Sequence, residues 1–259
     1  MQALSFITVC TASAHTGDIL PASSVPLVGI PHHTIARGIS YPVGTVLRLA
    51  SGVDAFKVVG HATFPSQGVH AVQCMLFQAL TPATLGRAIE CQAVRDHYAL
   101  AWVTLSDKGA RGERVDESGP LIASMVAADM DLCHAQGFLL PDDERSLRAL
   151  LMDLALTQGY DIILTTGGTG VGPRDVSPEA TNAVIEKHLY GFEIAMTQCS
   201  LAKTPHGAIS RAVVGTLGRS LIVNLPGSMK AVRENLAAIL PAIPHTVAKL
   251  QGDPSDCGS

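Results

Sequence analysis

Three short loops of this chain combine glycines, hydroxyls and acids, the residue types that bind phosphate or a metal ion. They are Ser106-Asp107-Lys108-Gly109, Thr165-Thr166-Gly167-Gly168-Thr169-Gly170 and Asn224-Leu225-Pro226-Gly227-Ser228. Glycines let backbone N–H groups approach an anion closely, and a hydroxyl adds one more donor. The second loop is therefore a candidate phosphate cradle, with a plain strand-to-helix turn as the alternative. The third loop also has a structural alternative, a turn followed by a serine N-cap.

Two aspartates stand near these loops and could hold a metal ion. Asp142 follows Leu139-Leu140-Pro141 at an expected strand end, and Asp175 follows the glycine loop. Mg²⁺ prefers one or two carboxylates together with substrate phosphates, so this pair suits a magnesium-dependent reaction of phosphates. The alternative for both is helix capping. It applies well to Asp142, which precedes Asp143-Glu144, because the helix dipole stabilises acids in a first turn.

Other common chemistries find little support in the residue pattern. The groupings His32-His33 and His70-x-x-x-Cys74 do not match a structural zinc spacing. The chain has no GxSxG nucleophile elbow, and no Gly-Lys-Ser/Thr follows its glycines as in a P-loop. No side-chain nucleophile is evident.

The elements that must position these loops alternate between strand and helix from Tyr98 onward. Continuous apolar runs at 98–105 and 161–166 predict buried parallel strands. Helices are predicted from a Ser118 cap through Cys133, over 143–158, over 178–187, and from Val232 with a break near Pro241 and Pro244, and a hairpin over 212–217 and 220–225. This alternation predicts an α/β domain with a mostly parallel sheet, helices on both faces and ligands at the carboxyl ends of the strands.

The first 95 residues have a different texture. They hold three acids and five bases, whereas residues 96–259 hold 19 acids and 13 bases. Short apolar runs at 25–30, 44–50, 55–64 and 69–80, separated by glycine, proline and serine, predict a small β-rich domain, either a barrel or a sandwich. We therefore expect a β-rich domain over 1–95, an α/β domain over 96–250 and a flexible tail over 251–259.

Composition narrows the class of protein. Hydrophobic residues make up 47% of the 259 residues and charged residues 15%, against roughly 25% charged in an average soluble domain, which excludes a disordered chain. A net charge of −4 argues against a nucleic-acid binder that acts through bulk positive charge.

No apolar run reaches the ~18 residues of a membrane span. The opening segment Met1–Ala14 has no Lys or Arg, which disfavours a signal peptide. Six widely spaced cysteines indicate reduced thiols in a cytoplasmic protein.

Taken together and in order, the motifs of residues 98–247 resemble those of the molybdopterin-binding family, in particular its molybdopterin adenylyltransferases. The matching stretches are residues 104–109, 116–119, 140–143, 164–170, 174–181, 210–212 and 224–228. The resemblance implies an ATP- and Mg²⁺-dependent transfer of AMP to the terminal phosphate of molybdopterin, with release of pyrophosphate. It also implies a homotrimer, which could hand its product to a molybdate-inserting enzyme.

The same resemblance implies roles for individual residues. Asp142 and Asp175 would position Mg²⁺ and the reacting phosphates. Phosphate would be cradled by Thr166, Gly167, Gly168, Thr169 and Gly170, and the pterin and nucleotide pocket would be lined by Ser106, Asp107, Asn224, Pro226, Gly227 and Ser228. Ser210 and Arg211 complete the motif set without individual roles.

The sequence leaves open two other functions for the α/β domain and two hypotheses for the N-terminal domain. The α/β domain could carry molybdopterin without chemistry, or insert molybdate as similar but much longer enzymes of the pathway do. Residues 43–49 bear a slight resemblance to the β-barrel domains named after molybdenum cofactor sulfurases. The alternative for residues 1–95 is a packing or oligomerisation module.

Overall fold

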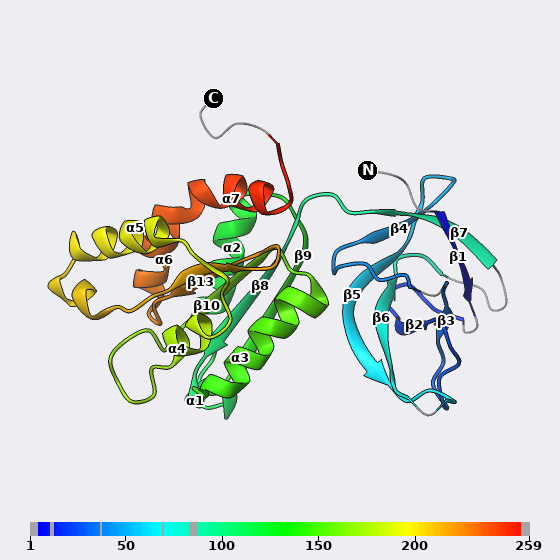
Figure 1. Cartoon of the computed structure of the whole chain (residues 1–259), viewed down its shortest axis with the longest axis horizontal. Coiled ribbons are helices and arrows are strands. Elements are labelled where there is room, and N and C mark those ends of the chain that lie inside the picture. Colours follow the sequence, from blue (N-terminus) through cyan, green and yellow to red (C-terminus); the bar gives the residue numbers. More distant parts are fainter. Residues whose placement is uncertain (1–4, 11–12, 37, 69, 83–87, 255–259) are drawn as a thin grey trace. The chain divides into compact units, whose positions relative to one another are not determined.

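The computed structural model describes residues 5–10, 13–36, 38–68, 70–82 and 88–254, and the chain forms two compact units, Met1–His97 and Tyr98–Ser259 (Figure 1). Residues 1–4 and 11–12 of the opening segment and residues 255–259 of the expected tail lie outside the described residues. Cys74, Cys91, Cys133 and Cys199 form no disulfide with one another, and the side chains of Cys10 and Cys257 lie outside the described part. None of the described helices is both long and apolar enough to span a bilayer.

The first unit is a closed β-barrel with the strand order β1-β3-β2-β6-β5-β4-β7. Its strands are β1 (Ser5–Cys10), β2 (Ile19–Ser23), β3 (His33–Thr34), β4 (Val46–Leu49), β5 (Asp54–Phe64), β6 (Val72–Ala79) and β7 (Ala88–Val94). A barrel is one of the two β architectures expected. β4 and β6 fall within expected runs, and β5 begins one residue before the run at 55–64. The run at 25–30 forms no named strand. Leu27 makes only an isolated bridge to Ser66. The pairing does not extend into a strand, because Pro26 has no N–H to donate and Gly29 turns the chain with a φ of +65°.

His33 of β3 lies in the apolar core of the barrel and is 1% exposed. Its ring centroid is 4.9 Å from that of Phe56 and 6.2 Å from that of Phe77. Among the described residues, its Nδ1 has no hydrogen-bond partner. Burial, with a smaller contribution from the charge of His32, lowers the pKa of His33 from 6.5 to about 4.

We expect the barrel to lose stability as the pH falls below about 6.5, because the unfolded chain then binds a proton that folded His33 does not. The loss should approach about 3 kcal/mol near pH 4 and be absent above pH 7. The volume-conserving change His33→Leu should remove it, so that lowering the pH from 7 to 5 costs the variant about 2 kcal/mol less than wild type. Urea unfolding followed by circular dichroism measures this. His70→Leu, at an exposed histidine, is the control, and a pH dependence that persists in His33→Leu would assign the effect to other groups.

The second unit is built on a sheet with the strand order β11-β12-β13-β10-β8-β9. Its strands are β8 (Tyr98–Leu105), β9 (Leu132–Leu140), β10 (Ile162–Thr166), β11 (Lys187–His188), β12 (Val214–Leu217) and β13 (Ser220–Leu225). The pairs β8–β9, β8–β10 and β10–β13 are parallel, and β12 and β11 add antiparallel pairs at one edge. The mostly parallel sheet expected from the sequence is thus confirmed, as is the hairpin of β12 and β13.

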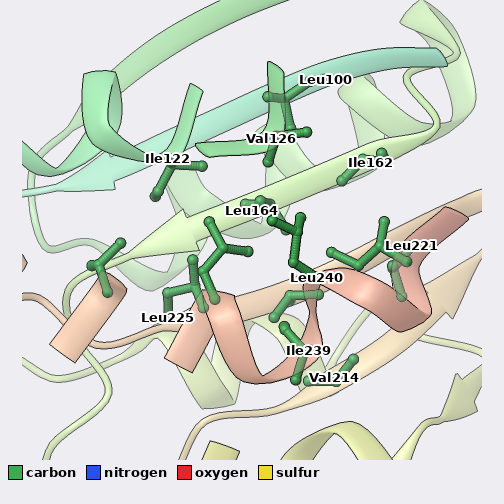
Figure 2. Close-up of a cluster of buried hydrophobic side chains, with 14 of the residues drawn as sticks. Leu100, Ile122, Val126, Ile162, Leu164, Val214, Leu221, Leu225, Ile239 and Leu240 are labelled. Carbon is green, nitrogen blue, oxygen red and sulfur yellow. The ribbon is translucent and has the colours of Figure 1, made fainter. Parts of the chain in front are cut away.

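Helices cover both faces of this sheet. They are α1 (Asp107–Ala110), α2 (Ser118–Asp129), α3 (Glu144–Met152), α4 (Ser177–Asn182), α5 (Tyr190–Leu201), α6 (Met229–Ile239) and α7 (Ile243–Leu250). Figure 2 shows the core on one face, where Leu100 and Leu164 of the sheet meet Val126 of α2 and Ile239 of α6. α3 and α4 lie over the other face (Figure 1). The predicted break of the last helix is confirmed, because a short 3₁₀ turn at Leu240–Ala242 separates α6 from α7.

The bounds of two predicted helices are wrong, and one helix has no counterpart in the predictions. Ser118 is the first residue of α2 and not its cap, and the helix ends at Asp129, because Met130 is extended and leads into β9, which contains Leu132 and Cys133. The helix expected over 178–187 ends at Asn182, and Lys187 pairs with Thr216 at the sheet edge. α5 was not expected at all: its apolar residues are spread around the helix and give little periodic signal.

Candidate functional site

The sheet brings the predicted loops to one edge, the carboxyl ends of its parallel strands. Thr166 at the end of β10 stands opposite Thr104 of β8 and Leu225 of β13, and Leu105 stands opposite Leu140 of β9. The chain leaves all four strands at this level. The loops that begin at residues 106, 141, 167 and 226 are therefore neighbours in space, as expected for the ligand edge of an open α/β sheet.

A polar pocket of about 410 Å³ opens between these loops. Among the residues predicted from the sequence it is lined by Ser106, Thr166, Gly167 and Gly227. The remaining lining residues, which the sequence-based site did not include, are Thr104, Leu105, Gly109, Arg114, Val115, Asp116, Glu117, Ser118 and Leu139. The available signal was the Asp-Glu-Ser-Gly-Pro segment, where acids precede a helix start.

Asp116 is held rigidly at the wall of this pocket. Its Oδ2 accepts a 2.7 Å hydrogen bond from the Thr104 hydroxyl, and its Oδ1 accepts one of 3.0 Å from the Gly119 N–H. The absence of a side chain at Gly119 is required, because a Cβ there would lie 2.4 Å from Asp116 Oδ2 and 2.5 Å from the ring of Trp102. Gly119 therefore lies against both Trp102, the single tryptophan of the chain, and Asp116, which lines the pocket.

The glycine loop is a strained turn that side-chain hydroxyls hold in place. Gly167 and Gly168 have φ values of +97° and +65°, which favour glycine. The Ser177 hydroxyl donates to the Gly167 carbonyl at 2.7 Å, and the Thr166 hydroxyl donates to the Pro226 carbonyl at 2.7 Å. A Cβ at Gly227 would lie 3.3 Å from the Gly167 Cα, so the second and third of the three predicted loops touch. Thr166 and Gly167 thereby reach the first pocket.

Arg211 clamps the far end of the same loop. Its Nε donates to the Gly170 carbonyl at 2.7 Å, its Nη2 donates to the Asp175 carbonyl at 2.9 Å, and its backbone N–H donates to the Thr169 carbonyl at 2.9 Å. The guanidinium also pairs with Glu179, and this contact lowers the pKa of that carboxyl. The structure therefore places Arg211 as the support of the loop.

A second cavity, of about 650 Å³, is lined by the later part of the glycine loop. The predicted residues Thr169, Gly170, Ser210 and Pro226 line it. The rest of its wall comes from α5, the 3₁₀ turn at Pro205–Ile209 and α6, through Ser200, Thr204, His206, Gly207, Ile209, Ala231 and Glu234. The loop that is predicted to cradle phosphate thus lines two cavities, the first through Thr166 and Gly167 and the second through Thr169 and Gly170.

The two aspartates singled out for a metal ion both use one oxygen for the backbone. Asp142 Oδ2 accepts the Asp107 N–H at 3.1 Å, and Asp175 Oδ2 accepts the Gly172 N–H at 2.8 Å. The capping alternative for Asp142 is wrong, because Asp143 caps α3 by accepting the Ser146 N–H at 2.8 Å. Asp107 returns the contact, since its Oδ1 accepts the Asp142 N–H at 3.1 Å.

Asn224 and Ser228 were expected to line the substrate pocket, but neither lines the first pocket. Asn224 is fully buried beneath the strand ends, where its amide nitrogen donates to the hydroxyls of Thr165 and Thr181 at 2.9 and 2.8 Å. Its Oδ1 accepts the Val213 N–H at 3.3 Å, so the amide is satisfied inside the protein. Ser228 caps α6 through the Ala231 N–H at 3.3 Å, which is the alternative that the sequence left open.

Known proteins resemble this chain in its second unit. Residues 101–245 match the family model described as a probable molybdopterin binding domain. A molybdopterin adenylyltransferase of Haemophilus influenzae is 39% identical over 138 residues, which cover 53% of this chain and 70% of that protein. One of Helicobacter pylori is 36% identical, covering 58% and 86%. Gephyrin of Dictyostelium discoideum is 35% identical over 168 residues, and the match spans only 23% of its length.

Solved structures resemble the same part of the chain. The crystal structure of the molybdopterin biosynthesis enzyme MoaB from Thermus thermophilus superposes with a TM-score of 0.56 at 40% identity. It covers 61% of this chain and 99% of that one. A tungsten cofactor synthesizing protein MoaB from Pyrococcus furiosus gives a TM-score of 0.54 at 30% identity, covering 61% and 99%.

Proposed function

The chain belongs to the molybdopterin-binding domain family, and we propose that it is an enzyme that transfers AMP from ATP to the terminal phosphate of molybdopterin. The observation that carries this proposal is the glycine loop, which lines two cavities and is supported by Arg211. Asp175 lies close to its last glycine, because a Cβ at Gly170 would be 2.8 Å from Asp175 Oδ2. Two cavities that share the glycine loop would bring two phosphate-bearing substrates together at that loop. Relatives named molybdopterin adenylyltransferase add support.

The reaction needs positioning and charge neutralisation more than it needs a nucleophilic side chain. A phosphate oxygen of molybdopterin attacks the α-phosphorus of ATP, a new P–O bond forms, the bond to the bridging oxygen breaks and pyrophosphate leaves with the electron pair. Both reactants are anionic, so donors aimed at the developing charge lower the barrier. In this site Ser106 lines the first cavity and Ser210 lines the second, and each carries a hydroxyl. The Thr166 hydroxyl is already used, because it donates to the Pro226 carbonyl.

The donor set fits Mg²⁺. Among the described residues, the hydrogen bonds at Asp142 and Asp175 engage Oδ2 and leave Oδ1 for a ligand. One or two carboxylates completed by substrate phosphates is the usual manner of binding this ion. No group of three or more His, Cys, Asp or Glu in the described part of the chain could form a metal cage. Asp142 and Asp175 are the residues that would hold Mg²⁺, and the ion would supply neutralisation of phosphate charge.

The experiment that tests the function is an assay of the purified chain with molybdopterin, ATP and Mg²⁺. Pyrophosphate and adenylated molybdopterin should appear in equal amounts. Binding of molybdopterin with no loss of ATP would favour the carrier. Consumption of adenylated molybdopterin only when molybdate is added would favour molybdate insertion, which is a reason to include that arm.

We also propose that the chain assembles as a homotrimer in the cytoplasm and passes its product to a molybdate-inserting enzyme. α5 exposes three large apolar side chains that a second copy would cover, since Tyr190, Ile194 and Leu201 are 62%, 55% and 47% exposed. Light scattering should give a mass of three times 27.0 kDa. Ile194→Asp should lower it toward that of one chain, and a wild-type mass of 27.0 kDa would contradict the proposal.

For the barrel we propose a packing or oligomerisation role. Sulfur transfer of the kind suggested by the slight resemblance to sulfurase barrels needs a reactive thiolate. Cys74 and Cys91 are each 2% exposed, and burial raises the pKa of Cys74, which disfavours its thiolate. These two thiols are better suited to packing.

A further inference from the structure

An ion pair between Asp107 and Arg174 links the loops that carry the two proposed magnesium ligands. Arg174 Nη2 lies 2.7 Å from Asp107 Oδ1 and 2.8 Å from Oδ2, and Nε lies 3.2 Å from Oδ2. Arg174 belongs to the loop after β10, whereas Asp107 begins α1 after β8. The guanidinium lowers the pKa of Asp107, which keeps its carboxylate ionised.

Asp107 is at the same time bonded to Asp142. The two residues exchange backbone-to-carboxylate hydrogen bonds, Asp107 N–H to Asp142 Oδ2 and Asp142 N–H to Asp107 Oδ1, each of 3.1 Å. A continuous chain of contacts therefore runs from Asp142 through Asp107 to Arg174, the residue next to Asp175. Both oxygens of the Asp107 carboxylate are engaged in these contacts, so Asp107 connects the loop of Asp142 to the loop of Arg174.

We propose that Arg174 is a positioning residue that fixes the loop of Asp175 relative to Asp142 and so sets the geometry of the metal-binding carboxylates. This inference rests on the proposed function. Arg174 is 64% exposed and Asp107 is 32% exposed on their side chains, and exposed ion pairs contribute little to global stability. The guanidinium nevertheless contacts both carboxylate oxygens, and this bidentate geometry fixes the orientation of Arg174 relative to Asp107 as well as their distance. The pair thus affects where Asp175 stands far more than whether the domain folds.

The variants Arg174→Ala and Arg174→Lys test this, with Arg111→Ala as the matched control. Arg111 is also exposed and also holds a carboxylate with two bonds, to Glu113 at 2.8 and 3.1 Å, but it does not tie two loops together. We expect Arg174→Ala to lower kcat about 30-fold and to raise the Mg²⁺ concentration for half-maximal rate about 10-fold, because small displacements of reacting groups are costly. KM for ATP should change less than about 3-fold. Lysine should restore only part of kcat, since it cannot form the double contact.

A second readout does not depend on activity. Hydrogen exchange of the peptide over residues 167–176 should be about 10-fold faster in Arg174→Ala, while peptides from β8 and β10 and the unfolding temperature stay as in wild type. Arg111→Ala should match wild type in every measurement. If wild type transfers no AMP, the proposed function and this inference both fail. If wild type is active and Arg174→Ala behaves like Arg111→Ala, or loses activity only together with global stability, the inference alone is overturned.

Discussion

Asp175→Asn and Asp142→Asn should each lower the rate of AMP transfer by about 100- to 1000-fold, the usual effect of removing one electrostatic contact at a reacting phosphate. Both changes delete a negative charge and keep the shape of the side chain. The asparagine oxygen can still accept the Gly172 N–H at position 175 or the Asp107 N–H at position 142. The unfolding temperature should therefore stay within about 2 °C of wild type. Initial rates of pyrophosphate release with saturating ATP and molybdopterin measure the effect.

Asp143→Asn is the control for this prediction, because it removes the charge next to Asp142 without touching a proposed ligand. Asp143 accepts the Ser146 N–H as the cap of α3, and asparagine is an equally good cap. Its rate should remain within about 3-fold of wild type. Equal losses in all three variants would mean that the acids act only through the general field of the site. Full activity in Asp175→Asn or Asp142→Asn would remove that residue from the catalytic machinery.

The parts of the fold that could be predicted from the sequence are those whose signal is local. β8 and β10 are buried on both faces, so their sequences are continuous apolar runs bounded by polar turns. The site edge followed from these strands, because residues after parallel strands must lie together. The glycine loop and Asp175 were found in this way.

The parts that could not be predicted depend on partners far away in the chain. Asn224 is polar at a strand end, which indicates a ligand, yet its amide is satisfied by Thr165 and Thr181, 59 and 43 residues away. The role of Arg211 and the link from Arg174 to Asp107, 67 residues away, are likewise tertiary contacts. In the barrel, β3 has two residues and owes its place to the neighbouring strands, so it gives no periodic signal.

Gly167→Ala is expected to destabilise the second unit by about 2–4 kcal/mol, the range of severe single substitutions. Its unfolding temperature should fall by roughly 5–15 °C for a unit of this size. Two effects combine at this position. Residues with a side chain rarely adopt a φ of +97°, and an added Cβ would lie 2.6 Å from the backbone carbonyl oxygen of Leu105. Because this atom belongs to the end of β8, relief requires the glycine loop to move away from the strand and out of the first cavity.

Gly112→Ala separates these two effects. Gly112 has a φ of +72°, but nothing lies within 4 Å of a Cβ built there, so its alanine variant carries the backbone strain without the clash and should lose only about 1 kcal/mol. Thermal unfolding followed by the fluorescence of Trp102, the single tryptophan, reports on the unit that contains both glycines. If the two variants lose the same stability, the close approach of the loop to β8 is unimportant. A larger loss in Gly167→Ala, accompanied by loss of AMP transfer, would mean that contact with the end of β8 holds the loop in the shape that AMP transfer requires.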